Sequence, residues 1–93
     1  MREFFIDDHL NKILLKLFKK DRHRYTILMK KIEEILTCVD IEHYKNLRKP
    51  LQHLKSVHIN THFVLVFRYN KEQDSILFYD FDHHESIYMK YTN

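Results

Sequence analysis

A chain of 93 residues with no glycine, a net charge of +3 and a single cysteine can bury one modest hydrophobic core, so we expect one domain over residues 1–93. The absence of glycine excludes the glycine-rich loops that bind nucleotide phosphates, and no apolar run approaches the roughly 18 residues of a membrane span. Because Cys38 has no partner for a disulfide and no secretory leader opens the chain, we expect a soluble protein of the reducing cytoplasm.

The first part of the chain predicts a strand followed by a helical hairpin. Residues 2–6 have the apolar and aromatic character of a short strand, after which Asp7 is a suitable N-cap. Apolar residues then recur at i, i+3, i+4, i+7 and i+8 over residues 10–18, and a second apolar stripe runs through residues 25–39. These two amphipathic helices are expected to pack side by side.

The next segment, residues 40–56, has no sustained period and contains the only proline, which predicts a surface crossing. Its basic side chains are Lys45, Arg48, Lys49 and Lys55. Positive charge is concentrated early in the chain, since residues 1–56 hold 13 Lys and Arg against eight Asp and Glu, whereas residues 57–93 hold three against five. A basic surface favours an anionic partner, although lysines on a solvated helix give the same count without one.

From Val57 onward the apolar period changes to two. Runs of β-branched and aromatic residues at 57–59, 62–69 and 75–81 predict an antiparallel meander of three strands. The turns must place positive φ on Asn or Asp, and the candidates are Asn60, Asn70 and Asp74. The predicted order is β-α-α-β-β-β, an α+β domain in which the helical hairpin packs on one face of a small, mainly antiparallel sheet and leaves the other face open.

Histidine is the residue type with the clearest chemical potential in this chain. Five of the eight histidines lie in the last 41 positions: His53, His58, His62, His83 and His84. Because an imidazole can give and take protons near neutral pH, a cluster of them on one sheet face could serve as general acid and base. We interpret His9, His23 and His43 as ordinary surface side chains.

The spacing of the first predicted hairpin leaves the position of His58 open. A loop of three residues, 59–61, would place His58 opposite His62 on one face of the sheet. A loop of two residues, Asn60 and Thr61, would instead pair Ile59 with His62 and send His58 to the opposite face.

Metal binding and cysteine chemistry are the other possibilities. The segments "DFDHHE" and "HINTH" offer imidazole and carboxylate ligands, but their spacing matches no zinc pattern. Cys38 has no neighbouring motif that would activate a thiol, and a buried, inert cysteine is the usual case. We therefore expect no metal site, no cofactor and no cysteine nucleophile.

Four features of residues 44–88 occur in a distinctive order. They are "KPLQ" at 49–52, His58 at the start of a hairpin, an apolar strand that ends in a basic residue at 63–68, and His84 followed four residues later by Tyr88. This order resembles the RelE/ParE superfamily of type II toxin–antitoxin toxins, and most closely its YafQ-like branch. In that branch a "HPLQG" segment, the hairpin histidine, the strand and a terminal "GTH" or "GSH" before an aromatic recur in this order.

The resemblance implies a cytoplasmic endoribonuclease that cuts messenger RNA in the ribosomal A site, inhibits translation, and is held inactive in an oligomer with a cognate acidic antitoxin. Neither a metal nor a membrane takes part in such a reaction. The 2′-hydroxyl of the substrate is the nucleophile, so the protein supplies a base, an acid and cations. Two alternatives stay open, which are a ParE-like inhibitor of DNA gyrase and a catalytically degenerate RNA-binding relative.

Roles for the candidate catalytic residues also follow from the resemblance. His84 is expected to be the general acid, with Tyr88 stacking or hydrogen-bonding near the scissile nucleotide. His58 would orient the substrate or stabilise charge, and His62 stands where the branch often has an aspartate. Lys49 stands where YafQ-like toxins carry a histidine proposed as general base. Because a lysine is ordinarily protonated at neutral pH, the base role would pass to one of two histidines, His53 or His58.

The remaining candidates are expected to contact RNA. Arg68 would bind phosphate, and Arg48 and Lys55 would meet the backbone of messenger or ribosomal RNA. His53 would lie on the same surface. On an extended chain His83 points to the side opposite His84. It is then expected either to border the RNA-binding surface or to pack within the fold. Two acids, Asp80 and Asp82, would keep His84 protonated if either lies beside it.

Overall fold

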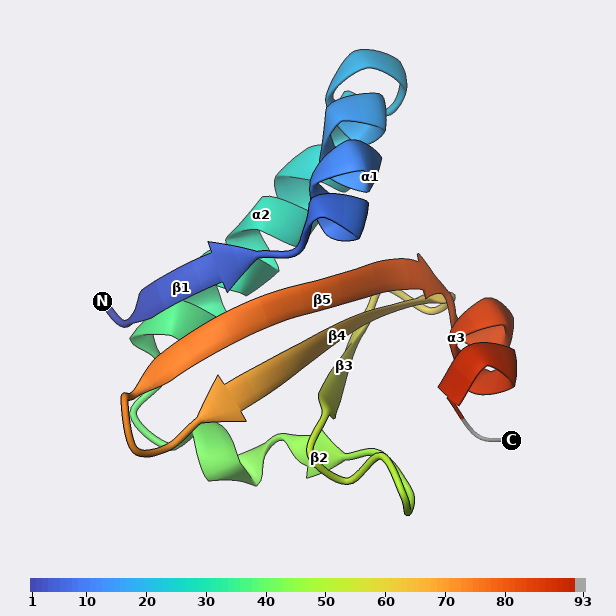
Figure 1. The fold of residues 1–93 in the computed structure, drawn as a ribbon. Coiled ribbons are helices and arrows are strands. Elements are labelled where there is room, and N and C mark those ends of the chain that lie inside the picture. Colours follow the sequence, from blue (N-terminus) through green and yellow to red (C-terminus); the bar gives the residue numbers. More distant parts are fainter. Residues whose placement is uncertain (92–93) are drawn as a thin grey trace.

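The fold is a five-stranded mixed sheet with a helical hairpin at one side and a third helix at the end of the last strand (Figure 1). The computed structural model describes residues 1–91. The strand order is β1-β5-β4-β3-β2, in which β1 runs parallel to β5 and the other neighbours are antiparallel. In chain order the elements are β1 (Glu3–Ile6), α1 (Asp8–Lys20), α2 (Arg22–Thr37), β2 (Lys45–Asn46), β3 (Lys55–Ile59), β4 (Phe63–Asn70), β5 (Ser75–His83) and α3 (His84–Tyr91).

The helical hairpin forms where the apolar spacing predicts it. The Asp7 carboxylate caps α1 by accepting a hydrogen bond from His9 N at 2.9 Å, and the Asp21 carboxylate caps α2 by accepting one from Arg24 N at 3.1 Å. The buried side chains of both helices join one face of β3, β4 and β5 in a single core: Leu10, Leu14, Leu28, Ile32, Ile35, Leu36, Ile41, Ile59, Leu65, Phe67, Ile76, Phe78 and Phe81. Burial of these apolar groups is the main force that holds the hairpin on the sheet.

The turn chemistry follows from the absence of glycine. Asn60 and Asp74 have φ values of 59° and 49°, so two of the three expected positions carry the left-handed conformation. Asn70 has a different role, because its side-chain oxygen accepts a hydrogen bond from Gln73 N at 3.2 Å in the β4–β5 turn.

The segment before β3 is more regular than its sequence suggests. A 3₁₀ turn at Ile41–His43 leads into the two-residue strand β2, which pairs with the start of β3. β3 also begins two residues before the predicted start, at Lys55, and this lysine is only 3% exposed. Its ammonium donates hydrogen bonds to Tyr44 O and Asn46 Oδ1, both at 3.0 Å. The prediction that Lys55 meets an RNA backbone is therefore wrong, because its charge is used inside the fold.

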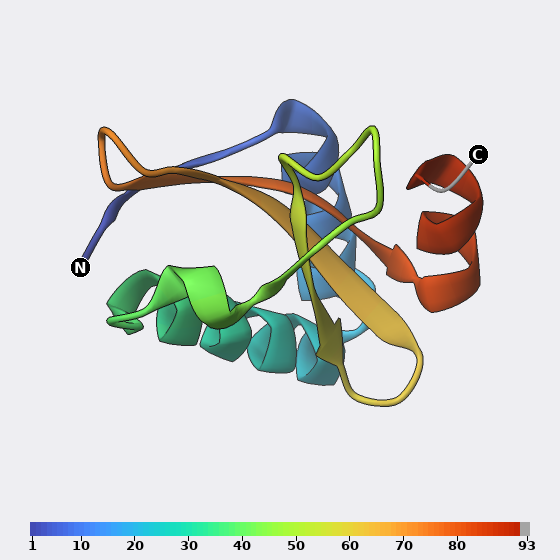
Figure 2. The ribbon, with the colours of Figure 1, turned by 90° about the horizontal axis from the view of Figure 1, so that it is seen from below.

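The chain after β5 is helical, which corrects the expectation that His84 lies on an extended segment after the predicted strand. β5 continues to His83, and α3 begins at the next residue (Figures 1 and 2). Ile87 of α3 packs with Val64 and Val66, which alternate with the core residues of β4 and so lie on the face away from the hairpin. The face predicted to be open is thus partly covered by α3 and by Leu54 of the β2–β3 loop.

The β3–β4 turn also differs from both sequence-based alternatives. Ile59 pairs with Phe63 and His58 pairs with Val64, so the turn contains residues 60–62. His62 therefore lies in the turn and faces no partner across the hairpin. His58 shares a sheet face with Val64, which is the face that α3 covers. No helix within residues 1–91 combines the length and apolar character that crossing a membrane requires.

Candidate active site

A hollow of about 180 Å³ lies between α3 and the face of the sheet that carries His58. Three side chains that the sequence singled out line it together: His58 from β3, and His84 and Tyr88 from α3. Ser56 and Val64 of the sheet and Leu47 of the β2–β3 loop also line it. The site thus combines an apolar base with two imidazoles and a phenol at its rim.

The periodicity of α3 explains why these groups meet. His84, Ile87, Tyr88 and Tyr91 are spaced at i, i+3, i+4 and i+7, so they share one side of the helix, and all four line the hollow. Ile87 is 4% exposed and anchors that side to the sheet, whereas Tyr88 is 59% exposed and stands at the rim. Burial of one apolar residue therefore fixes the direction of two candidate functional groups.

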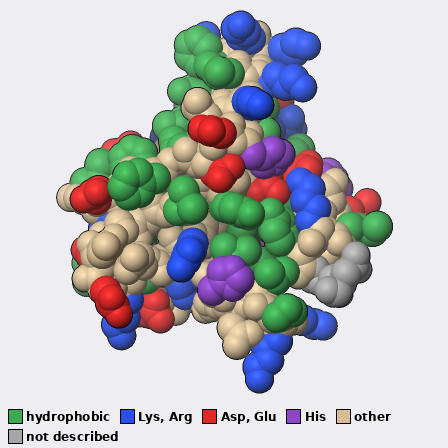
Figure 3. Space-filling model, in the orientation of Figure 1, with side chains coloured by type: hydrophobic (Ala, Val, Ile, Leu, Met, Phe, Trp, Pro, Cys, Tyr) green, Lys and Arg blue, Asp and Glu red, His purple; other side chains and the backbone are tan. Residues whose placement is uncertain are grey.

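A second hollow, of about 240 Å³, adjoins the first, and Tyr91 lines both. It contains His53 from the β2–β3 loop and Arg68 from β4. Within residues 1–91 the Arg68 guanidinium has no ion pair and is exposed, so its charge is available to an anion. In the space-filling view, hydrophobic side chains on this side of the sheet lie between basic and histidine side chains (Figure 3).

His84 is held at the first position of α3 by the β3–β4 turn. Its backbone N–H donates to His62 O at 2.7 Å, and its ring nitrogen Nδ1 lies 3.3 Å from the same oxygen. A carbonyl oxygen can only accept, so Nδ1 carries the proton of this contact and Nε2 is left to exchange a proton with a substrate. The ring of His84 is half-buried, so both its position and its tautomer are constrained.

A buried carboxylate, Asp80, fixes the far end of α3. Asp80 is 1% exposed and accepts hydrogen bonds from Lys90 Nζ at 3.1 Å, Tyr91 OH at 2.9 Å and Phe81 N at 2.8 Å, while His9 Nε2 of α1 lies 3.0 Å away. Burial acts to raise the pKa of this carboxyl, but the hydrogen bonds from Lys90 and Tyr91 outweigh it and the pKa is lowered. We call this group the Asp80 node; it joins α1, β5 and α3.

The partners of Asp80 respond in the opposite sense. Burial and then the hydrogen bond to Asp80 raise the pKa of the Tyr91 phenol. Burial acts to lower the pKa of Lys90, but hydrogen bonds to Asp82 and Asp80 prevail and raise it. The Lys90 ammonium is thus paired with two carboxylates inside the protein, so we do not include it among the cations that could bind RNA.

The acids of "DFDHHE" serve α3 and not the imidazole of His84. Asp82 accepts hydrogen bonds from Lys90 Nζ and from His83 N, at 3.1 and 2.8 Å. Among the described residues neither Asp80 nor Asp82 forms a hydrogen bond or an ion pair with the His84 ring, so the expected acidic neighbour of His84 is not there. His9, interpreted as an ordinary surface residue, instead contacts the Asp80 carboxylate, although its side chain stays 58% exposed.

Of the remaining predicted residues, two border the hollows and two lie away from them. Arg48 and Lys49 are exposed in the loop that contributes Leu47 to one hollow and His53 to the other. His83 points to the hairpin side of the sheet, as its alternation predicts, and its ring packs edge-on against Phe63 with centroids 5.6 Å apart. His62 lies beside His83 and His84 and is absent from the hollow that His84 lines.

Comparison with known proteins now decides the family. The chain matches no protein-family model. It is 47% identical over 90 residues to a protein of Methanocaldococcus jannaschii named "Putative toxin RelE4", and the match covers 97% of this chain and 94% of that protein. The chain belongs to the RelE toxin family. This membership confirms the resemblance deduced from residues 44–88 and extends it over nearly the whole chain.

Solved structures of RelE-type proteins share the fold. The intact E. coli RelBE toxin–antitoxin complex contains a chain that matches with a TM-score of 0.70 at 18% identity, over 89% of this chain and 96% of that one. YafQ from E. coli strain BL21(DE3) matches with a TM-score of 0.64 at 12% identity, over 95% and 99%. The α+β architecture of this RelE-family chain is therefore that of RelE and YafQ.

Sequence reasoning missed two elements of this RelE-family site, the Asp80 node and Tyr91. The signal for Tyr91 was present, since His84, Ile87, Tyr88 and Tyr91 already have helical spacing. No signal in the sequence indicates the Asp80 node, because two of its contacting residues, His9 and Asp80, lie 71 positions apart.

Proposed function

We propose that this RelE-family protein is the toxin of a type II toxin–antitoxin system and cleaves messenger RNA on the ribosome without a metal ion. The observation that carries the proposal is the meeting of His58, His84 and Tyr88 around one hollow, next to a second hollow with an unpaired Arg68. These groups supply what cleavage of RNA by its own 2′-hydroxyl requires: a base, an acid, a stacking surface and a cation.

The proposed reaction is an internal transesterification. His58 accepts the proton of the 2′-hydroxyl as the 2′-oxygen attacks the adjacent phosphorus. His84 donates a proton from Nε2 to the departing 5′-oxygen, so the products end in a 2′,3′-cyclic phosphate and a 5′-hydroxyl. Arg68 binds the phosphate, and Tyr88 stacks on a base beside the scissile bond. His58 is favoured over His53 as the base because it shares a hollow with His84.

Lys49 and Arg48 have a supporting role in this proposal. Both are exposed on the loop that borders the two hollows, where their charges offset the negative RNA backbone. A lysine ammonium does not accept a proton at neutral pH, so Lys49 does not replace the histidine of YafQ-like toxins as base. We assign no direct contact with the scissile phosphate to His62 or His83, which lie outside both hollows.

We further propose a cognate acidic antitoxin as the partner that inhibits the toxin, in an oligomeric complex. The support is the family, in which the RelBE structure is that of a toxin–antitoxin complex, and the basic charge of this chain. A carboxylate-rich segment can cover the same cations that would otherwise bind RNA.

The proposed reaction predicts the chemistry of the cleaved ends. The purified protein, added to ribosomes translating a defined message, should produce fragments with 2′,3′-cyclic phosphate and 5′-hydroxyl ends, and EDTA added to the protein before mixing should leave the rate unchanged. End-specific ligation and labelling identify the two termini. Fragments with 5′-phosphate ends, or a rate that falls after EDTA treatment of the protein, would point to a metal-dependent hydrolysis and remove the proposed mechanism.

Tyr88 offers a test of how the substrate base is held. Stacking on an aromatic ring contributes about 1–3 kcal/mol per base, so Tyr88→Ala should lower kcat/KM by roughly 5- to 150-fold. Tyr88→Phe keeps the ring and should retain most of the activity. If the phenylalanine variant is as slow as the alanine variant, the hydroxyl and not the ring is the important group, and the stacking role is wrong.

The alternative of a ParE-like gyrase inhibitor makes a different prediction. Such an inhibitor would block supercoiling by purified gyrase and would not depend on an imidazole at position 84. The placement of His58 and His84 around one hollow favours the nuclease. A supercoiling assay with the wild-type protein separates the two functions directly.

A further inference from the structure

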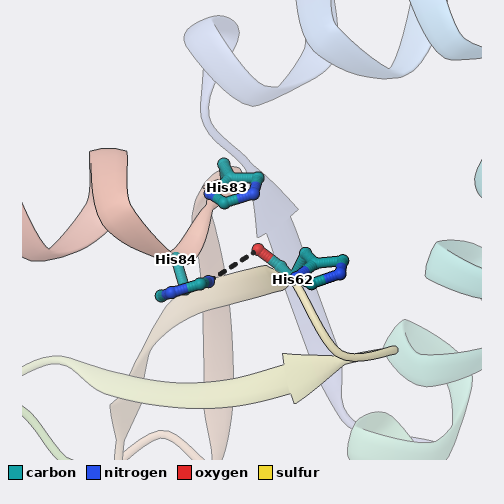
Figure 4. Close-up of side chains that lie close together, drawn as sticks. All are labelled: His62, His83 and His84. Atoms are coloured by element: carbon teal, nitrogen blue, oxygen red, sulfur yellow. Dashed lines mark hydrogen bonds between the residues drawn. The ribbon is translucent and has the colours of Figure 1, made fainter.

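Three histidines gather where the β3–β4 turn meets the junction of β5 and α3. One possible ligand nitrogen from each of His62, His83 and His84 lies within 4.8 Å of the others (Figure 4). The rings are close to parallel, with centroids 4.8 Å apart for His83 and His84 and 5.7 Å apart for His62 and His83. Within residues 1–91 the cluster contains no carboxylate and no hydrogen bond between its rings, so no acidic partner inside the described protein balances the three basic groups.

The backbone holds the cluster together before any ligand binds. His83 is paired across the sheet with Phe63, the residue after His62. The next backbone N–H, that of His84, donates to His62 O at 2.7 Å. The three Cα positions are therefore set by the β4–β5 ladder and the start of α3, and only side-chain rotation remains to be fixed. Such preorganisation lowers the entropic cost of binding a ligand to all three rings.

We propose that His62, His83 and His84 form a binding site for a divalent transition metal ion such as Zn²⁺, with water in the fourth position. Zinc binds imidazole nitrogen at about 2.0–2.1 Å in a tetrahedral arrangement, which separates ligand nitrogens by roughly 3.3 Å. The nitrogens already lie within 4.8 Å of one another, and because the rings are stacked, rotation about the side-chain bonds must both shorten these distances and turn the lone pairs toward one point. His62 is exposed and the other two rings are half-buried, so an ion can enter from solvent.

The hydrogen bonds around the rings are ones that an ion can replace. The Nδ1 edge of His84 faces His62, and Nδ1 lies 3.3 Å from the His62 carbonyl oxygen, so an ion between the three rings would take Nδ1 in place of that contact (Figure 4). Glu85 N lies 3.5 Å from His83 Nδ1, the outer limit of a hydrogen bond, so the ring of His83 is free to change its tautomer. Three imidazoles without a thiolate suit Zn²⁺, Cu²⁺ or Ni²⁺ better than Mg²⁺ or Ca²⁺.

Occupation of this site removes His84 from proton transfer, because an imidazole whose Nδ1 binds an ion cannot also become the doubly protonated ring that donates a proton from Nε2. The site therefore makes the metal an inhibitor and not a cofactor. This consequence rests on the proposed nuclease function, whereas the binding itself does not. The site also lies at the joint between β4, β5 and α3, so an ion there would stabilise the end of α3 that carries the candidate active site.

Calorimetry with Zn²⁺ tests the site on the purified full chain. We expect one equivalent to bind, and Co²⁺ to give the visible absorption of a tetrahedral site. Loss of an outer-sphere partner alone weakens metal affinity by about tenfold or more, so His62→Gln and His83→Gln should each raise Kd at least tenfold. His23→Gln, on the exposed start of α2, should leave Kd unchanged.

A second histidine site is the main competing explanation. Cys38 Sγ lies 3.8 Å from His43 Nδ1 and could hold zinc with a nearby oxygen. Binding that survives His62→Gln and His83→Gln but is lost in Cys38→Ser would overturn the proposal, as would the absence of binding to the wild-type protein. Circular dichroism of each variant shows whether it has kept its fold.

The inhibitory consequence is tested on the same protein preparation. Zinc at one equivalent should reduce ribosome-dependent cleavage, and EDTA should restore it. If zinc binds to the three histidines and cleavage is unaffected, the inhibitory role is wrong while the site stands. If no cleavage occurs under any condition, the proposed nuclease function fails, and calorimetry still decides the metal site independently.

Discussion

Replacing His84 by glutamine should lower the rate of ribosome-dependent messenger RNA cleavage by about 10²- to 10⁴-fold, the range that one proton-transfer group contributes. Glutamine keeps the size and a hydrogen-bonding capacity of the side chain but cannot release a proton to the leaving 5′-oxygen. The change should appear mainly in kcat, because the departing oxygen gains charge only in the transition state. Single-turnover cleavage of a message bound in the ribosomal A site measures this step.

Two controls distinguish loss of an acid from loss of structure. The circular dichroism spectrum of His84→Gln should match that of the wild-type protein, so that the lower rate does not reflect unfolding. His23→Gln serves as the matched control, because its imidazole is exposed on α2. Cleavage by His84→Gln at the wild-type rate would show that His84 is not catalytic and would favour the RNA-binding or gyrase-inhibiting alternatives.

The sequence predicts the parts of this fold whose signal is local. Four elements have a long enough run of periodic apolar residues for the sequence alone to show which face is buried: α1, α2, β4 and β5. β2 pairs only two residues with β3 and leaves no period to detect. The sequence does not determine the register of β3 against β4, because the short segment between Ile59 and Phe63 allows several pairings. The observed pairing depends on which side chains the whole core buries.

The sequence also indicates only part of the candidate site. His84 and Tyr88 are four residues apart, and their resemblance to a family motif identified them even though the segment was expected to be extended. On an extended chain residues i and i+4 also share a side, so the wrong secondary structure still placed both on one face. His83 and the acids behave differently, because their roles depend on contacts with Phe63, Lys90 and Tyr91 that only the folded chain creates.

The covering of the second sheet face by α3 changes how the site is assembled. An open sheet would present His58 on a flat surface, whereas α3 turns that surface into a hollow with His84 and Tyr88 on the opposite wall. The positions of these two groups relative to His58 then depend on how firmly α3 is held. Ile87 anchors the middle of the helix, and the Asp80 node anchors its end. The proposed cleavage should therefore be sensitive to a carboxylate that lines neither hollow.

Asp80→Asn should destabilise the protein by about 2–3 kcal/mol at pH 7, because hydrogen bonds to a charged group contribute roughly 1.5–3 kcal/mol and an amide replaces the carboxylate poorly. Asp82→Asn is the matched control, since it also loses a contact with Lys90 but its side chain is 41% exposed. Exposed ion pairs contribute about 0–1 kcal/mol, so the control should change little. Urea unfolding followed by circular dichroism gives both values, and equal losses in the two variants would contradict the node.

The contribution of the Asp80 carboxylate to stability should depend on pH. The pKa of Asp80 is lower in the folded protein than its ordinary value, so the stabilisation is fully present above that ordinary value and is lost as the pH falls through the lowered pKa. The difference in unfolding free energy between wild type and Asp80→Asn should therefore be large at pH 7 and should shrink below about pH 4.

The same substitution should also lower the rate of cleavage at pH 7, because α3 is then held less firmly in place. Reduced protection from amide hydrogen exchange that is confined to α3 would identify this cause. Full protection of α3 in the variant would show that Asp80 does not position His84 and Tyr88.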